Sequence, residues 1–477
     1  MKLEELRGKK VVILALGKFK QGSGVAAAKF CLRHGAKLLI TDTSKKSETP
    51  LTVGIVEKAL ADYKSKGLKV YTPKWVMGGH REEDMVWADL IVQGPAIPFD
   101  SKYLLYAEHL GKKIETDLSL FFDLCPYSTI GITGTRGKTT TTMLVGEIMK
   151  LHDKRAVLGG NIRVSPLEVI EKILKSKNAM PIVLEISSWQ AEGLARSKQS
   201  PHIAALTNLS EDHLNRYGTM EKYAAAKESL FASQTPDDIA IFNNDDEWGR
   251  KISKRMKSHV VLTSMSPSFN GNGVFWRKSD LIARFNGKEK TVLTVKDVKL
   301  EGQHNLANVA MAVAISLAYG VPAQLIKKAV RGFKGVPDRQ EVLRVWKGIT
   351  FVNDTTATSP EGLRAALARF ASKPVVLIGG GTDKALPLDS LAPEIVKRTK
   401  SAILFKGTAT DKLLAAWPHD ALKPAIATSM KEAFDLALGQ AKRGDIILLS
   451  PGAASFGIFA NEFDRGEQFR KLVKKLK

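Results

Sequence analysis

Short apolar runs alternate with amphipathic stretches along most of the chain. Residues 11–17 and 37–43 are rich in Val, Ile and Leu, as strands are, and residues 23–35 between them have the apolar spacing of a helix that ends at Gly35. A third strand-like run covers residues 89–98. Regular alternation of strands and helices is typical of parallel sheets covered by helices, so we predict an α/β protein.

The alternation returns twice, and its interruptions predict three domains. Residues 270–302 carry Asn-Gly turns between short alternating runs, which predict antiparallel hairpins, and an apolar helix at 305–320 follows. We place the domains at 1–126, 127–334 and 335–477. The further predicted strands are 128–134, 181–188, 203–210, 238–245, 259–264, 349–354, 374–381, 401–407 and 445–455.

Composition narrows the functional classes. The 477 residues fit about three domains of ~150 residues each. The chain has no apolar run near the ~20 residues of a membrane span, and we expect its first apolar run to be a strand and not a signal peptide. Its two cysteines lie outside metal or redox spacings, so we predict a cytoplasmic protein. The net charge of +23 is spread along the chain without interleaved aromatics, which argues against nucleic-acid binding and favours attraction of a polyanionic substrate.

The stretch TGTRGKTT, residues 133–140, lies between a predicted strand and a predicted helix. Gly134 and Gly137 allow a tight turn whose N–H groups point inward, and the helix N-terminus favours an anion. Lys138 is placed to reach outer phosphates and Thr139 to bind Mg²⁺ through its hydroxyl. The common pattern G-x-x-x-x-G-K-[ST] fails by one residue, because its first glycine would fall on Ile132.

Three other residues stand where they could complete such a site. Glu185 ends a predicted strand, at the edge where α/β proteins hold ligands, and a solvated glutamate is the alternative. His213 follows another strand within NLSEDHLNRYG, where a structural histidine is the alternative. Lys227 lies in an Ala-rich predicted helix, where a solvated lysine would be ordinary. The residues alone leave both interpretations open.

Taken together, these motifs resemble the Mur ligase family, the ATP-dependent amino-acid ligases of peptidoglycan synthesis. TGTRGKTT matches the shortened phosphate loop T-G-T-x-G-K-[ST]-[ST] of that family, which accounts for the misplaced glycine. The resemblance implies a Rossmann-like first domain, a central phosphate-loop ATPase domain with a mostly parallel sheet plus a small antiparallel sheet, and a Rossmann-like last domain. It continues in order through GGNIR, LEISSWQ, DHLNRYG, YAAAK, GQHNLANVAMA, PDRQE, FVNDTTATSP, GGGTDK and LLSPGAASFG.

Within the family, the chain is most similar to the members that add glutamate to UDP-N-acetylmuramoyl-L-alanine. LEISSWQ, GGNIR and SPGAASF carry this likeness, and the D-N-P-R motif of the members that add a diamino acid is missing from the sequence. The resemblance implies that ATP phosphorylates the substrate carboxylate and that the amino group of glutamate, most simply D-glutamate, displaces phosphate to form an amide. We also expect a monomer that binds no membrane.

The resemblance also implies roles for individual residues. The catalytic set is Lys138, His213, Lys227 and Asn161. The ATP site contains Gly134, Thr135, Gly137, Lys138, Thr139, Thr140, Asn305, Asn308, Arg339 and Asp354, with the two asparagines near the adenine. Two Mg²⁺ ions are held by Thr139, Glu185, His213 and Lys227, and Lys227 is carbamylated, which turns a cation into an oxygen ligand.

The two outer domains are expected to hold the substrates. The spacing of Gly17, Gly22 and Gly24 is not the dinucleotide fingerprint, so NAD is not expected. Instead, Gly17, Asp42 and Thr43 would contact the UDP group, and Asn161 the reacting end of this substrate. The glutamate would meet Thr358, Lys384, Ser455 and Phe456 in the last domain.

Two departures from the family pattern fall in the last domain. The chain has NDTTATS where many glutamate-adding members have NDSKATN, so Thr356 replaces a lysine. It has NEFDRG where many have NFExRG, so Glu462 and Phe463 are exchanged. L-glutamate therefore stays open as the added amino acid.

A folate or poly-glutamate ligase of the same superfamily is a second alternative, although its loop usually is G-T-N-G-K-G-S. A basic nucleic-acid-binding protein with a relic fold is a third.

Overall fold

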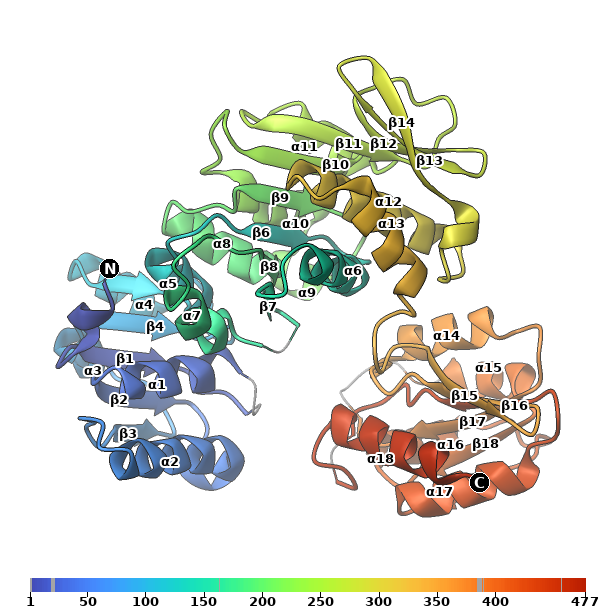
Figure 1. Cartoon of the computed structure of the whole chain (residues 1–477). Helices are drawn as coiled ribbons and strands as arrows, with labels where there is room; N and C mark the ends of the chain where they lie inside the picture. Colours follow the sequence, from blue (N-terminus) through green and yellow to red (C-terminus); the bar gives the residue numbers. More distant parts are fainter. Residues whose placement is uncertain (1, 19–21, 163, 384–387, 389, 456) are drawn as a thin grey trace. The chain divides into compact units, whose positions relative to one another are not determined.

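The computed structural model describes residues 2–18, 22–162, 164–383, 388, 390–455 and 457–477. The chain divides into two compact units, Met1–Phe333 and Lys334–Lys477. Each unit consists of mostly parallel sheets flanked by helices, which confirms the predicted α/β class (Figure 1). The predicted boundary near residue 126 lies inside the first unit, between its two sheets.

The first sheet has five parallel strands in the order β3-β2-β1-β4-β5. Its central strand is buried on both faces: Val11 and Ile13 face α1 and α5, whereas Val12 and Leu14 face α3 and α4. Burial on both faces explains the continuous apolar runs that predicted these strands. The elements are β1 (Lys10–Leu14), α1 (Ser23–Arg33), β2 (Lys37–Asp42), α2 (Pro50–Ser65), β3 (Lys74–Met77), α3 (Glu82–Trp87), β4 (Leu90–Gln93), α4 (Lys102–His109), β5 (Lys113–Glu115) and α5 (Asp117–Leu124).

The second sheet has nine strands in the order β14-β13-β12-β11-β10-β9-β6-β8-β7. Its helices are α6 (Lys138–His152), α7 (Pro166–Leu174), α8 (Ser188–Arg196), α9 (Leu214–Tyr217), α10 (Met220–Glu228), α11 (Glu247–Ser253), α12 (Gln303–Ala318) and α13 (Ala323–Gly332). Its strands are β6 (Ile130–Thr133), β7 (Val157–Gly160), β8 (Ile182–Glu185), β9 (Ile203–Leu206), β10 (Ile239–Asn243), β11 (His259–Ser264), β12 (Gly273–Arg277), β13 (Asp280–Phe285) and β14 (Lys288–Thr294).

The predicted hairpins are β12–β13 and β13–β14, and both pairs are antiparallel. They continue the parallel sheet instead of forming a sheet of their own, because β12 pairs in parallel with β11. Gly273, which pairs with Leu262, has a φ of 147°, and a Cβ there would overlap the backbone of Leu262. A glycine at the start of β12 therefore allows the two strands to meet.

The first two sheets share one buried apolar cluster, which explains why they form a single unit. The cluster includes Cys31 of α1, Phe121 of α5 and Ile170 of α7. Polar contacts cross the same surface: Lys29 Nζ lies 3.0 Å from Glu168 Oε1, and the hydroxyl of Ser165 donates to Asp117. The first sheet is thus fixed against the elements that follow β7.

The second unit has one sheet in the order β15-β16-β20-β17-β18-β19, in which only the β15–β16 pair is antiparallel. One face packs on α14, α15 and α16, and the other on α17 and α18. The elements are β15 (Glu341–Trp346), β16 (Ile349–Asn353), α14 (Pro360–Arg369), β17 (Val375–Gly380), α15 (Leu391–Arg398), β18 (Ser401–Phe405), α16 (Thr408–Ala415), β19 (Ala425–Ala427), α17 (Met430–Gln440), β20 (Ile446–Leu449) and α18 (Glu462–Lys475).

Candidate active site

The register of the second sheet aligns the carboxyl ends of four strands. Glu185 of β8 pairs with Ile132 of β6 on one side and with Gly160 of β7 on the other. Thr133 of β6 pairs with Leu206 of β9. The segments that follow these four strands therefore leave the sheet along one edge, the edge at which α/β proteins bind ligands.

The loop between β6 and α6 requires glycine at its turns. Gly134 has a φ of 143° and Gly137, which precedes the first residue of α6, has a φ of 79°. A Cβ on Gly134 would overlap Thr207 Oγ1, and one on Gly137 would overlap Asn308 Oδ1. Both glycines are thus set by close packing as well as by backbone conformation.

Replacing Gly134 by alanine should lower kcat/KM for ATP by about 100-fold, because displacing the loop by about 1 Å misplaces the groups that hold phosphate. Initial rates of phosphate release at varied ATP concentration measure this effect. Gly287→Ala is the matched control, because Gly287 also has a positive φ, 74°, but a Cβ there meets no atom within 4 Å. Equal losses in the two variants would contradict the packing argument.

The segment after β9 holds the loop in shape. The N–H of Thr135 donates to the Asn208 carbonyl at 2.8 Å, and the N–H of Arg136 donates to Asn208 Oδ1 at 3.0 Å. Thr207 Oγ1 donates to the Arg136 carbonyl at 2.6 Å. The Thr135 hydroxyl also receives the N–H of Ser210 at 3.1 Å. Sequence reasoning missed Thr207 and Asn208, whose signal is the polar pair that ends the apolar run IAALTN.

Lys138 begins α6 and folds back over the loop. Its Nζ lies 2.9 Å from the Gly134 carbonyl and 3.0 Å from the Thr135 carbonyl. Thr139 and Thr140 follow it in the first turn and are partly exposed, whereas Thr141 and Thr142 are buried. The loop therefore presents a cation and two threonine side chains at a helix N-terminus, which is a favourable place for a phosphate group.

Glu185 is 2 % exposed, and its two carboxylate oxygens differ. Oε1 accepts a hydrogen bond from Asn161 Nδ2 at 2.9 Å, whereas Oε2 is buried without a hydrogen-bond partner. The N–H of Asn161 also donates to the Glu185 carbonyl at 2.8 Å. A buried carboxylate oxygen without a donor is costly unless a cation or donor meets it.

Lys227 of α10 is 2 % exposed and faces this group. Burial lowers the pKa of Lys227 to about 7, and the nearby Lys138 cation lowers it in the same direction. The carboxylates of Asp212 and Glu185 oppose this change in the pKa. The Lys227 ammonium also lies 4.9 Å from the centre of the Tyr223 ring. The structure thus brings Lys138, Glu185 and Lys227 together, and a buried lysine replaces the solvated one that composition alone would favour.

His213 lies beside the same group with a strained backbone. Its φ is 53°, and its side chain is 60 % exposed. The ring centre lies 6.0 Å from that of Tyr223, whose hydroxyl contacts the Thr135 hydroxyl at 3.3 Å. Left-handed backbone at a residue other than glycine often marks functional sites.

Of the two predicted adenine residues, Asn308 lies against the phosphate loop and Asn305 lies beside Asn308. The side chain of Asn308 is the group that a Cβ on Gly137 would overlap, and its Nδ2 lies 3.3 Å from Asn305 Oδ1. Asn305 Nδ2 in turn donates to the Glu301 carbonyl at 2.7 Å. In the structure Asn308 of α12 thus packs against the start of α6, and Asn305 holds the Asn308 side chain.

In the first sheet, Asp42 joins two backbone segments after β1 and β2. Its Oδ2 accepts the N–H of Gly17 at 3.0 Å and its Oδ1 accepts that of Ser44 at 2.8 Å. Gly17 has a φ of 80°, and Thr43 is exposed. The buried carboxylate shapes this edge, while the predicted contact of Thr43 and Asp42 with uridine stays a prediction.

In the second unit, Asp354 is buried at the end of β16. Its Oδ2 accepts from the Ser450 hydroxyl at 2.8 Å and its Oδ1 accepts from the N–H of Gln340 at 3.0 Å. Burial raises the pKa of Asp354 to about 7, and the charge of Arg339 opposes this rise. Arg339 itself is exposed. The two predicted ATP residues of this unit are therefore neighbours.

The predicted glutamate residues are described only in part. Thr358 lies between β16 and α14 and is half-buried, and Ser455 after β20 is 4 % exposed. Ser455 lines a small pocket together with Gly381 and Arg465. Lys384 and Phe456 lie outside the described residues.

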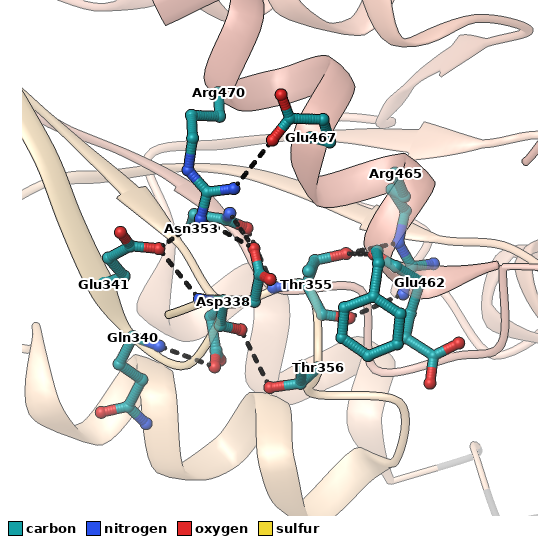
Figure 2. Close-up of polar contacts among 12 residues, drawn as sticks. Asp338, Gln340, Glu341, Asn353, Thr355, Thr356, Glu462, Arg465, Glu467 and Arg470 are labelled. Atoms are coloured by element: carbon teal, nitrogen blue, oxygen red, sulfur yellow. Dashed lines mark hydrogen bonds and ion pairs between the residues drawn. The ribbon is translucent and has the colours of Figure 1, made fainter. Parts of the chain in front are cut away.

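The two departures from the family pattern have partners in the structure. Thr356 stands where many members have a lysine. Its hydroxyl donates to the Asp338 carbonyl at 2.9 Å, which holds Thr356 against residues 337–341. Arg465 is fully buried, and its guanidinium donates to the Thr355 hydroxyl at 3.0 Å and carbonyl at 2.8 Å. Burial lowers the pKa of Arg465 to about 9, and the Glu462 carboxylate opposes this shift. Glu462, one of the two exchanged residues, thus places a negative charge near the buried Arg465 guanidinium (Figure 2).

Strand β6, its glycine loop and helix α6 define the class: the chain is an α/β protein with a phosphate-type loop at the carboxyl edge of its sheet. The family model of the Mur ligase middle domain matches residues 132–316, and that of the Mur ligase glutamate ligase domain matches residues 338–452. The chain belongs to the Mur ligase family, which confirms the resemblance drawn from the sequence.

Curated relatives match the chain over nearly its whole length. The UDP-N-acetylmuramoylalanine–D-glutamate ligase of Roseiflexus sp. (strain RS-1) is 39 % identical and covers 98 % of this chain and 99 % of its own. The protein of the same name from Koribacter versatilis is 38 % identical, covering 99 % and 98 %.

Solved structures agree with the fold. A UDP-N-acetylmuramoylalanyl-D-glutamyl-2,6-diaminopimelate–D-alanyl-D-alanyl ligase from Acinetobacter baumannii has a TM-score of 0.60 at 16 % identity, covering 99 % of this chain and 97 % of its own. The UDP-N-acetylmuramate–alanine ligase of Thermotoga maritima has a TM-score of 0.56 at 18 % identity, covering 98 % and 100 %. None of the helices that the structure describes has the length and apolarity to cross a membrane.

Proposed function

We propose that the chain is an ATP-dependent ligase that joins D-glutamate to UDP-N-acetylmuramoyl-L-alanine in the synthesis of peptidoglycan precursors. The observation that carries the proposal is the group of Lys138 with the buried Glu185 and Lys227, beside a glycine loop in a Mur ligase fold. The full-length relatives named as D-glutamate ligases support the amino acid. Because this reaction uses ATP and a UDP-linked precursor, we expect it to take place in the cytoplasm, and a monomer stays a prediction.

The proposed reaction has two steps. A carboxylate oxygen of the alanyl group attacks the γ-phosphorus of ATP, ADP leaves, and an acyl phosphate forms. The amino group of glutamate then attacks the acyl carbon, inorganic phosphate leaves and an amide remains. Lys138 balances phosphate charge in the first step, and the loop N–H groups and α6 orient the nucleotide, so the protein contributes positioning and charge stabilisation.

The residues fit a divalent cation. Among the described residues, no three His, Cys, Asp or Glu side chains form a metal-binding group by themselves, so substrate or modified-lysine oxygens would have to complete a site. Glu185 Oε2, buried without a donor, is an oxygen ligand of the kind that Mg²⁺ prefers. Thr139, Glu185, His213 and carbamylated Lys227 would hold Mg²⁺, which would neutralise phosphate charge.

Carbamylation of Lys227 is part of this proposal. Only an uncharged amine adds to CO₂, with formation of an N–C bond and release of a proton. A pKa of about 7 leaves a substantial share of the Lys227 amine uncharged at neutral pH. The modified side chain would place oxygen atoms near Glu185, where a bare lysine offers none.

Product analysis tests the proposal. The protein is incubated with ATP, Mg²⁺ and UDP-N-acetylmuramoyl-L-alanine, with D- or L-glutamate in turn, and the products are identified by mass spectrometry. We expect one phosphate for each amide formed and D-glutamate as the preferred amino acid. Amide formation only with L-glutamate would change the proposed specificity. Phosphate release with a folate substrate, but not with UDP-N-acetylmuramoyl-L-alanine, would show that the protein is a folate ligase instead.

A further inference from the structure

Residues 337–341 form a strained loop at the start of the second unit. Asp338 and Gln340 have φ values of 64° and 44°, in the left-handed region that residues other than glycine seldom adopt. Between them lies Arg339, whose side chain is exposed. Strained backbone persists only where surrounding contacts fix it, so the contacts of this loop determine where Arg339 is held.

Arg470 of α18 contacts Asp338 and Glu341, which flank Arg339 in sequence (Figure 2). Its Nη2 lies 3.0 Å from Asp338 Oδ1 and 2.7 Å from Glu341 Oε2. The Arg470 and Asp338 side chains are only 18 % and 15 % exposed, so water screens their interaction less than that of a surface pair. The same oxygen of Glu341 accepts the N–H of Asp338 at 2.9 Å, which closes the turn. Glu467, one helical turn earlier, receives Nη1 at 3.1 Å.

The loop is tied on its other side to the residues after β16. Asp338 Oδ1 also accepts from Asn353 Nδ2 at 2.7 Å, and the Asp338 carbonyl accepts from the Thr356 hydroxyl. The N–H of Gln340 donates to Asp354 Oδ1. Asp338 therefore joins three parts of the chain: the loop, the segment that ends β16, and α18.

We propose that Arg470 is a positioning residue that fixes Arg339 for contact with the phosphates of ATP. The inference rests on the proposed function and on the prediction, implied by the family resemblance, that Arg339 meets the nucleotide. Arg470 acts through Asp338 and Glu341, which flank Arg339 in sequence. Its guanidinium is engaged by three carboxylates, so its role is to hold the loop, not to bind the nucleotide.

The first test compares Arg470→Met with Arg470→Lys. We expect Arg470→Met to raise KM for ATP about tenfold, with less than about a threefold change in KM for the other two substrates. Arg470→Lys should recover part of this loss, because it keeps the charge but not the forked geometry. Lys471→Met, on the exposed face of α18, is the matched control and should match wild type. Equal changes in all three KM values would overturn the proposal.

A double mutant separates positioning from general stability. If Arg470 acts through Arg339, then Arg470→Met should change KM for ATP by less than about twofold in an Arg339→Ala background. Multiplied effects of the two substitutions would contradict the inference. If Arg470→Met does not fold, Asp338→Asn takes its place in both tests, because asparagine tolerates the left-handed backbone and removes the charge that Arg470 meets.

Hydrogen exchange gives a readout that needs no activity. Amides of residues 338–341 should exchange about tenfold faster in Arg470→Met than in wild type, and Lys471→Met should leave them unchanged. Unchanged exchange in Arg470→Met would overturn the role of Arg470 whatever the kinetics show. A wild-type protein without ligase activity would instead refute the proposed function, and the exchange result would still stand.

Discussion

Lys138→Met should lower ATP-dependent phosphate release by about a thousandfold, because the loop loses the cation at the start of α6, where a phosphate group is favoured. In the structure the Lys138 ammonium rests on the carbonyls of Gly134 and Thr135, within reach of any group held at the start of α6. Phosphate release with saturating UDP-N-acetylmuramoyl-L-alanine and glutamate measures the effect.

Lys150→Met is the matched control for this variant. Lys150 lies on the same helix, but its ammonium pairs with Glu147 at 3.0 Å and its side chain is 47 % exposed. Near wild-type rates are expected, because an exposed ion pair of this kind contributes little. A Lys138→Met protein with rates within about tenfold of wild type would refute the assignment of the loop.

Lys227→Ala should lower the rate of ATP-dependent phosphate release by about a thousandfold. Short carboxylic acids such as acetate or propionate should restore part of this activity. The reason is that a free carboxylate can enter the space of the lost side chain and supply the oxygen atoms of a carbamate. Rates at increasing acid concentration measure the rescue. In wild type, ¹³C-labelled CO₂ should give a carbamate signal that Lys227→Ala lacks.

Lys222→Ala on the same helix is the control, since Lys222 is exposed and lies outside the buried group. It should retain activity and show no response to acids. Full activity of Lys227→Ala without added acid would exclude carbamylation from the mechanism, and an inactive variant that no acid rescues would limit Lys227 to a packing or charge role.

The sequence predicted the strands that are buried on both faces, but it did not predict the edge strands β3, β5 and β19. Runs such as VVILALG and PIVLEISS became β1 and β8, because a central strand needs apolar residues throughout. The three-residue strands β5 and β19 and the half-exposed β3 carry no such run. Their pairing depends on a neighbouring strand that is distant in sequence, so local pattern could not reveal them.

The candidate site divides in the same way. The glycine loop and Lys138 could be predicted from their spacing, because a tight turn before a helix restricts the residue types that fit. The burial of Lys227 and its shifted pKa depend on how α10 packs, which no local pattern shows. Thr207 and Asn208 were missed because their role is to hold a loop about 70 residues earlier. Arg470 was missed for the same reason, since its partners come from another part of the chain.

The contacts of Thr135 and Arg136 with Asn208 have a thermodynamic consequence for the nucleotide. Because the chain's own atoms make these contacts, they reduce the conformational entropy that the loop would lose on binding a nucleotide. Calorimetry should therefore record association with a rigid receptor, in which moving the Lys138 side chain away from two carbonyl oxygens is the main local rearrangement. The temperature dependence of binding would then reflect the stability of the folded protein, because no loop has to fold when the nucleotide binds.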